Sequence, residues 1–147
     1  MKELIEAKFS IGNVIKHKFL DFRGVIFDLD PEFNNTEEWY EAIPETMRPA
    51  KDQPFYHVLA ENKDIFYIAY VSEQNLLLEN LNKPANHPDI SSIFSHFESG
   101  SHVPASRAKN QVSKLKCAIC TAAAKTSIAF CNSIASTKVG ASLIVLS

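Results

Sequence analysis

Acidic residues are absent from the last third of this 147-residue chain. All 17 Asp and Glu residues lie at or before Glu98. Residues 1–98 therefore carry a formal charge of −8 (nine Lys and Arg against 17 acids), and residues 99–147 carry +6 (six bases and no acid). The overall charge of −2 averages two segments that differ in kind, and such a split predicts different partners or different origins for them.

Cysteine, glycine and long apolar runs are also scarce. The three cysteines, Cys117, Cys120 and Cys131, are odd in number and confined to the basic segment, which argues against a disulfide framework. One CxxC pair falls short of the four ligands of a structural zinc site, so we expect no metal and no cofactor. No N-terminal run has signal-peptide length, and Lys125 and Lys138 interrupt every window that could span a membrane, so we expect a cytoplasmic protein without membrane contact.

Motifs for catalysis or ion binding are missing as well. Asp28, Asp30 and Glu32 alternate like the first ligands of a calcium loop, but Phe33 replaces the turn glycine and Trp39 the bidentate glutamate. These acids are therefore expected to form a solvated loop. No nucleophile elbow, HExxH motif or phosphate-binding glycine loop is present. We expect a binding protein rather than an enzyme.

Runs of β-branched and aromatic residues predict a chain rich in β-strands. Strand periodicity covers residues 14–19, 22–30, 55–60 and 65–71, and a shorter apolar run covers 76–78. The two-residue link of Asn62 and Lys63 predicts a tight hairpin. Because the two strands that it joins are apolar on both faces, the sheet must curl on itself or be covered. A small β-barrel satisfies this requirement.

Two short helices complete the predicted fold. Thr36 and the two asparagines before it can cap a helix whose first turn is acidic. Pro44 ends that helix, and the prolines up to Pro54 keep the connection extended. Asp89 is expected to cap a second helix that includes Phe94 and Phe97 on its apolar face.

A polar stretch that contains Gly100 and Pro104 predicts a domain boundary. It divides the chain into residues 7–98 and residues 99–147. The second segment is basic and rich in Ala and Ser, and we expect it to be either helical or disordered. A foreign reading frame or a lineage-specific extension would explain its composition.

An aromatic pair flanked by acids is the candidate partner site. Trp39 either packs beneath its loop as part of a satellite core, which is the favoured interpretation, or stays partly exposed as an anchor for a protein partner. The anchor would comprise Glu37, Glu38, Trp39 and Tyr40. Acids around an aromatic suit a basic or peptide ligand and do not suit a phosphate backbone.

Three linked segments resemble the HspQ family of heat shock proteins, also called the YccV-like or hemimethylated-DNA-binding family. They are HKFLDFRGVIFDLDPEFNNTEEWYEAIPE, KDQPFYHVLAENKDIFYIAYVSEQNL and NHPDISSIFSHF, and the resemblance runs from about Ala7 to Phe97. It implies a small, cytoplasmic SH3-like β-barrel with short helices, tied to heat stress and to degradation of denatured proteins. It also implies self-association, and nothing from it extends to residues 108–147.

Two functions follow from the resemblance and the charge. The first is an adaptor that assists a cytosolic protease in degrading denatured client proteins, for which a −8 segment is suitable. The second is a reader of hemimethylated double-stranded DNA. Phosphate contacts require several bases on one face, and only five residues are candidates for such a cluster: Lys16, Lys18, Arg23, Arg48 and Lys51. In the first predicted strand Lys16 and Lys18 share one face, and His17 and Phe19 share the other.

Overall fold

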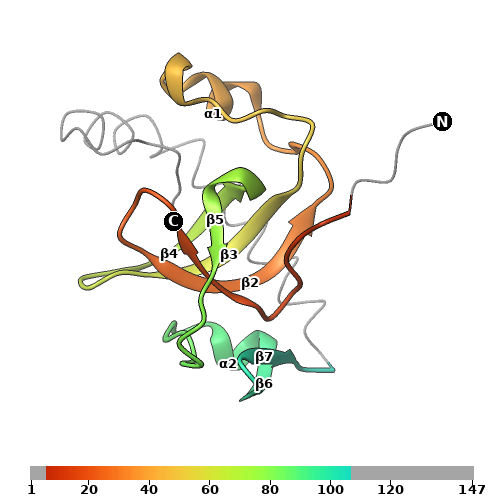
Figure 1. Cartoon of the computed structure of the whole chain (residues 1–147), viewed down its shortest axis with the longest axis vertical. Coiled ribbons are helices and arrows are strands. Elements are labelled where there is room, and N and C mark those ends of the chain that lie inside the picture. Colours follow the sequence, from red (N-terminus) through yellow and green to blue (C-terminus); the bar gives the residue numbers. More distant parts are fainter. Residues whose placement is uncertain (1–5, 107–147) are drawn as a thin grey trace.

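A computed structural model describes residues 6–106, which form a mainly β structure with short helices (Figure 1). This confirms the predicted fold class. The predicted helix or disorder of the basic tail falls on residues 107–147, outside the described part. The elements in chain order are β1 (Val14–His17), β2 (Arg23–Asp30), α1 (Glu37–Glu41), η1 (Glu45–Met47), β3 (Phe55–Glu61), β4 (Phe66–Ser72), η2 (Glu73–Asn75), β5 (Leu76–Leu78), α2 (Ile90–Ile93), β6 (Phe94–Glu98) and β7 (Ser101–Pro104).

Five strands form the main sheet, in the order β4-β3-β2-β1-β5. Every neighbouring pair is antiparallel. Among residues 6–106 the two edge strands, β4 and β5, do not pair with each other, so the sheet does not close into the expected barrel. β5 has only three residues, and the chain after it turns away toward a second sheet made of β6 and β7.

Both faces of the main sheet are buried, as the apolar pattern requires, but separate segments cover them. The N-terminal residues Ala7 and Phe9 pack against one face, whose buried residues include Ile26 and Tyr56. The small sheet covers the other face, below the main sheet in Figure 1. The second core consists of Val25, Phe27, Leu59, Ile68, Ala85, Ile93 and Phe94.

The N-terminal segment is held in place by a buried hydrogen-bonded pair. The Tyr56 hydroxyl donates to a Glu73 carboxylate oxygen over 2.6 Å. The same oxygen accepts the backbone N–H of Lys8 (2.9 Å), and the Tyr56 oxygen accepts that of Phe9 (3.2 Å). Burial and the Glu73 carboxylate raise the pKa of Tyr56, so its phenol stays protonated and remains a donor.

The β3–β4 hairpin has a longer turn than the sequence predicts. Four residues, Asn62 to Ile65, separate the strands. The Asn62 side-chain oxygen accepts the backbone N–H groups of Asp64 and Ile65, each over 2.9 Å, and the Asn62 N–H donates to the Ile65 carbonyl. Because asparagine forms this local turn with its own side chain, the tight two-residue turn is not used.

The second helix is shorter than predicted, and the connection before β3 is not fully extended. α2 ends at Ile93 because Phe94 adopts an extended conformation (φ −112°, ψ 145°) and begins β6. Phe94 and Phe97 therefore lie on a strand that pairs with β7, and Asp89 makes no side-chain capping hydrogen bond.

The proline-rich connection contains the short 3-10 helix η1.

β7 lies beyond the boundary predicted after residue 98, and it contacts the start of the main sheet. The Gly12 carbonyl accepts the His102 N–H over 2.8 Å, and Asn13 forms a bridge with Ser101. Gly12 has a φ of +93°, and a Cβ there would lie 2.0 Å from the His102 carbonyl oxygen. The two backbones therefore meet at a position that only glycine can occupy.

Replacing Gly12 tests the importance of this contact. Gly100 is a matched control because its φ is also positive (+83°), but a Cβ added at Gly100 would have its nearest neighbouring atom 3.6 Å away. Gly100→Ala should lower the free energy of unfolding by about 1–2 kcal/mol through the left-handed backbone alone. Gly12→Ala should cost a further ~1–3 kcal/mol because β7 must shift. Urea unfolding of both variants measures the difference, and equal losses would contradict it.

Candidate functional site

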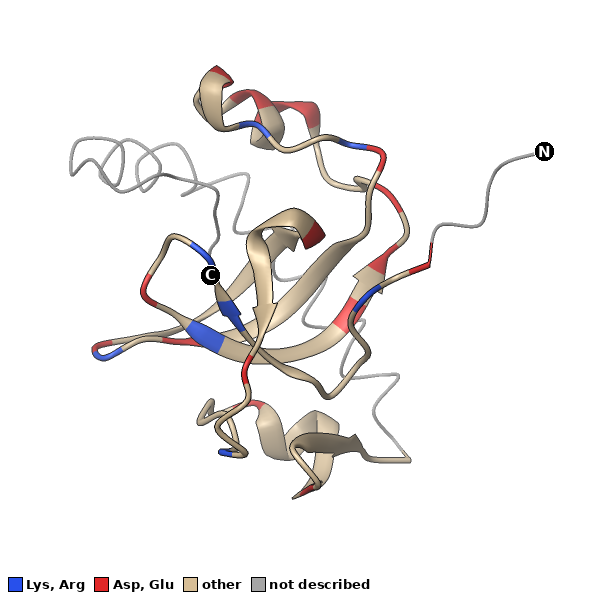
Figure 2. Cartoon of the chain, in the orientation of Figure 1, with Lys and Arg blue, Asp and Glu red and all other residues tan. Residues whose placement is uncertain are grey.

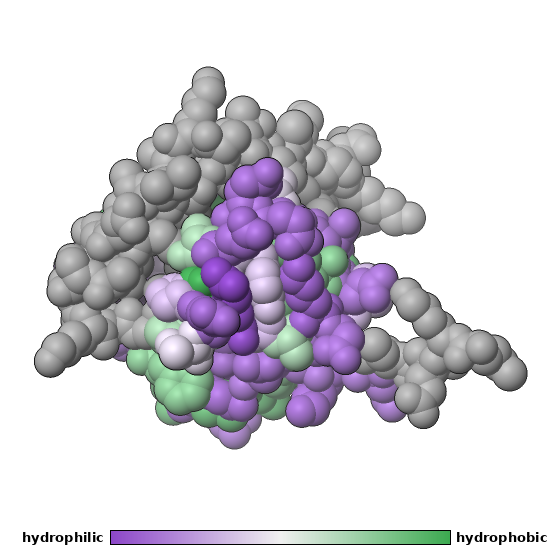
Figure 3. Space-filling view, turned by 90° about the horizontal axis from the view of Figure 1, so that it is seen from above, coloured by the Kyte–Doolittle hydropathy of each residue, from purple (hydrophilic) through white to green (hydrophobic). Residues whose placement is uncertain are grey.

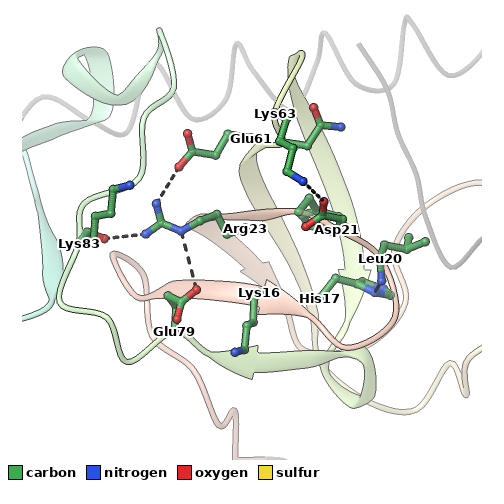
Figure 4. Close-up of a pocket in the computed structure, with 11 residues that line it drawn as sticks. Lys16, His17, Leu20, Asp21, Arg23, Glu61, Lys63, Glu79 and Lys83 are labelled. Carbon is green, nitrogen blue, oxygen red and sulfur yellow. Dashed lines mark hydrogen bonds and ion pairs between the residues drawn. The ribbon is translucent and has the colours of Figure 1, made fainter.

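A shallow groove of about 360 Å³ lies beside β1, β2 and the segment after β5 (Figure 4). Arg23 lies at its centre, with Nη1 2.9 Å from Glu61 Oε1 and Nε 3.9 Å from Glu79 Oε2. Its guanidinium also donates to the carbonyl oxygens of Lys83 (2.7 Å) and Pro84 (3.1 Å). Arg23 thus joins β2 to β3 and to the segment that leads to the small sheet.

The positive and negative charges that line the groove nearly cancel. Lys16 is exposed. Lys63 forms an ion pair with Asp21, with 3.7 Å between Nζ and Oδ2, and both side chains are highly exposed (86% and 88%). With Arg23 and Lys83, the lining contains four bases against three acids. Such a balance gives little attraction for a phosphate backbone.

The five candidate DNA contacts fall into two groups. Lys16 and Arg23 are partners in the β1–β2 register, and Lys18 follows β1 directly, so these three lie together. Arg48 and Lys51 lie in the connection between α1 and β3, at the upper end of the molecule in Figure 2. The structure therefore does not bring the five bases to one face.

Both bases near α1 have internal partners. Arg48 donates from Nε to the Ile43 carbonyl and from Nη2 to the Glu41 carbonyl, each over 2.9 Å. Lys51 Nζ lies 2.6 Å from a Glu37 carboxylate oxygen and 4.3 Å from the centre of the Tyr40 ring. These contacts stabilise the loop, and Glu37 already has a cationic partner.

Trp39 is buried, with 8% of its surface exposed. Its ring stacks on Phe33 (5.9 Å between centroids) and meets Tyr70 edge-on (5.5 Å). The Thr36 hydroxyl caps α1 by accepting the Trp39 N–H over 3.2 Å, as the sequence predicts. The structure thus agrees with the satellite-core interpretation of Trp39 and does not present its ring as an anchor.

The remaining members of the predicted partner site are more accessible. Glu37 and Glu38 are exposed, whereas Tyr40 is half-buried and donates its hydroxyl to the Pro49 carbonyl over 2.7 Å. Acidic residues gather around α1 in Figure 2, and the view from above in Figure 3 shows a mostly hydrophilic surface at this end. A binding role for these three residues stays a prediction.

A buried polar cluster supports the loop before α1. His57 Nε2 lies 3.0 Å from Asp30 Oδ2, and the Tyr70 hydroxyl donates to the same oxygen over 3.1 Å. The Tyr70 oxygen in turn accepts the Asn34 N–H. Asp30 is 6% exposed, so its expected place in a solvated loop is wrong. A register shift after Ile26, which no local pattern predicts, brings Asp30 and His57 together.

Phe19 is the functional candidate that the sequence missed. β1 ends at His17 instead of residue 19, and Phe19 does not share the buried position of His17 as strand alternation predicts but is 71% exposed. The His17 ring directs this change, because Nδ1 accepts the backbone N–H groups of Phe19 and Leu20, each over 3.1 Å. The ring lies 5% exposed beside Phe22.

Further backbone bonds fix this loop. His17 donates its N–H to the Phe22 carbonyl, Phe22 donates to the Leu20 carbonyl, and Lys18 donates to the Asn75 carbonyl. The Lys18 side chain also donates to the Gln74 carbonyl. The backbone that carries the exposed phenyl ring is therefore fixed, and a sequence pattern of alternating residues does not reveal such a loop.

Acid should loosen this loop. Burial, assisted by the charge of Lys18, lowers the pKa of His17 from 6.5 to about 4. Between about pH 6.5 and pH 4, His17 is protonated in the unfolded chain but stays neutral in the folded chain. The free energy of unfolding therefore falls as the pH is lowered through this range. The loss attributable to His17 between about pH 7 and pH 5 is about 2 kcal/mol.

Urea unfolding at the two pH values measures this loss. His17→Gln keeps an acceptor for the loop but cannot titrate, so its stability should fall less on acidification. Burial lowers the pKa of His87 and His102 as well. Both histidines remain in the variant, so the difference in stability loss between the two proteins is attributable to His17. An equal loss of stability on acidification in both proteins would refute the assignment.

Neither a metal cluster nor a membrane-spanning helix occurs within residues 6–106. No group of three His, Cys, Asp or Glu side chains there is placed to hold a metal ion. No helix in the described range is long and apolar enough to cross a membrane. The CxxC pair lies outside this range.

Comparison with known proteins gives one family and a group of relatives. A family model described as "hemimethylated DNA-binding protein YccV like" matches residues 7–101. F-box only protein 21 of Mus musculus is 33% identical over 97 residues, and that of Homo sapiens is 32% identical over 97 residues. Each alignment covers 65% of this chain but only 15% of the relative. No solved structure matches the chain.

Proposed function

The chain belongs to the YccV-like family of hemimethylated DNA-binding proteins, and we propose that it is a non-enzymatic heat-stress factor that helps a cytosolic protease degrade denatured proteins. In this role it binds protein rather than nucleic acid. The proposal includes a cytoplasmic location and self-association, as the family resemblance implies.

The charge of the described surface is the observation that carries this proposal. Residues 6–106 contain 16 acids and eight bases. Five of those bases have internal partners: Lys18, Arg23, Arg48, Lys51 and Lys63. A protein that contacts six to ten phosphates needs about as many free bases on one surface. The domain is better suited to protein partners.

The comparison with longer relatives supports a recognition role. The matching segment occupies 15% of F-box only protein 21, so a domain of this kind occurs as one part of a much longer chain. A small domain that is joined to other segments in a longer chain is suited to binding a partner protein on which those segments act. The functions of those other parts do not extend to this chain.

Turnover of a heat-denatured reporter tests the adaptor role. Cells that express the full chain should clear the reporter faster after a heat shift than cells without it. The double variant Glu37→Lys, Glu38→Lys should slow clearance about three- to tenfold, as expected when contacts worth about 0.7–1.4 kcal/mol are lost. Asp64→Lys, Glu98→Lys reverses two exposed charges elsewhere and is the matched control. If the unaltered chain does not accelerate clearance, the proposed function is wrong.

DNA binding is the second candidate, because the family description names it. We expect the full chain to bind hemimethylated and unmethylated duplexes of one sequence with the same affinity at about 150 mM salt. That affinity should fall steeply as salt rises, because the bases of residues 99–147 would supply nonspecific phosphate contacts. Titrations with fluorescent duplexes measure both properties. A tenfold preference for the hemimethylated duplex would favour the DNA function over the adaptor function.

A further inference from the structure

The outer edge of β5 is an open strand edge. The bonds from Lys18 N–H to the Asn75 carbonyl and from Glu79 N–H to the Val14 carbonyl fix which residues of β5 face β1. Since hydrogen-bonded pairs alternate along an antiparallel ladder, the backbone of Leu77 faces β1. The backbone groups of Leu76 and Leu78 therefore do not face β1. The Leu76 N–H is bonded to the Glu73 carbonyl, so the open groups of this edge are the Leu76 carbonyl and the N–H and carbonyl of Leu78, with which no strand pairs among residues 6–106.

Apolar side chains flank this edge on both faces of the sheet. Leu77 is 43% exposed on one face, and Leu78 is 47% exposed on the other. Phe19 follows β1, the strand that pairs with β5, and its ring meets that of His17, whose strand partner is Leu76. A strand added to β5 would cover Leu77 with one set of alternate side chains and Leu78 with the other.

The charges beside the edge indicate what kind of strand it suits. Lys16 is the register partner of Leu77, so their side chains lie on the same face, and Lys18 follows at the end of β1. Both lysines are exposed. Carboxylates on an incoming strand would be attracted to them, whereas lysines would be repelled.

We propose that the β5 edge binds an extended, apolar segment with flanking carboxylates from a partner protein, which adds to the main sheet as a sixth strand. Main-chain hydrogen bonds to the Leu76 carbonyl and to the N–H and carbonyl of Leu78 supply affinity, and Leu77, Leu78 and Phe19 contact the side chains of the segment. This inference rests on the proposed function, since denatured clients expose extended apolar segments of this kind. It places the client at β5 and leaves the acidic surface around α1, which the clearance experiment alters, for the protease.

The loop that carries Phe19 makes this surface ready for binding. Its backbone is fixed by the His17 ring and by bonds to Phe22 and Asn75. A phenyl ring on a backbone that is already fixed requires no ordering of the loop when a partner covers it, which reduces the entropic cost of binding. Exposed aromatic anchors of this type often contribute much of the binding energy of an interface.

Peptide binding to the full chain tests the proposal without a protease. The probe is a fluorescein-labelled peptide of about nine residues, the length of a long strand, in which Leu and Val alternate with Glu. A second peptide replaces Glu by Lys, and a third carries N-methyl groups on alternate backbone nitrogens. We expect the first to bind at least about tenfold more tightly than either of the others.

Three variants locate the site. Leu78→Pro removes an outward N–H without removing a bond to β1, and should weaken binding about tenfold. Phe19→Ala should weaken it about five- to tenfold. Leu81→Ala is the matched control, because Leu81 is 70% exposed but lies outside β5. Circular dichroism shows whether Leu78→Pro folds, and Phe19→Ala decides the outcome if it does not.

Several results would overturn the proposal. Equal binding of the Lys peptide or of the N-methylated peptide excludes charge selection or strand addition, respectively. Displacement of the peptide by a short DNA duplex would mean that the surface binds nucleic acid. Loss of self-association in Phe19→Ala, measured by light scattering, would mean that a second copy occupies the edge. If peptide binding follows the expected pattern but reporter clearance does not accelerate, the site stands and the proposed function fails.

Discussion

Strands β3 and β4 bury almost every side chain on both of their faces, and this constraint determines the arrangement of the other segments. A sheet with one face in water would leave one set of these apolar side chains exposed. The chain solves the problem with two covers. The N-terminal segment lies over Tyr56 on one face, and the small sheet lies over Leu59 and Ile68 on the other.

Each cover depends on polar contacts as well as apolar ones. Glu73 holds the N-terminal segment through the Lys8 N–H and the Tyr56 hydroxyl. Arg23 holds the segment that leads to the small sheet, through the backbone carbonyls of Lys83 and Pro84. Arg23, which the sequence suggests as a candidate DNA contact, is thus already used to hold the fold together. This explains why counting bases along the chain overestimates those available to a ligand.

The sequence predicts the strands better than it predicts their assembly. Period-two alternation locates β2, β3 and β4, and Thr36 caps α1 as expected, because these features depend on neighbouring residues. The pairing of Asp30 with His57 depends on a register shift between two strands. The end of β1 depends on a buried His17 ring that accepts loop N–H groups, and the change from α2 to β6 at Phe94 depends on pairing with β7. Local patterns contain no information on such long-range contacts.

The same constraint accounts for the open edge. Because the chain after Leu78 must turn back to cover the Leu59 face, it cannot continue along β5 and close the sheet onto β4. Natural proteins commonly protect an open edge with charges on the strand itself, a bulge or a proline. β5 is short, which is one such protection, but its residues are three leucines, two of them almost half exposed. The cost of exposing this edge is easiest to understand if a partner covers it. Residues 6–106 contain twice as many acids as bases, yet two exposed bases, Lys16 and Lys18, lie beside β5. The backbone groups of Leu78 in that strand have no strand partner among these residues.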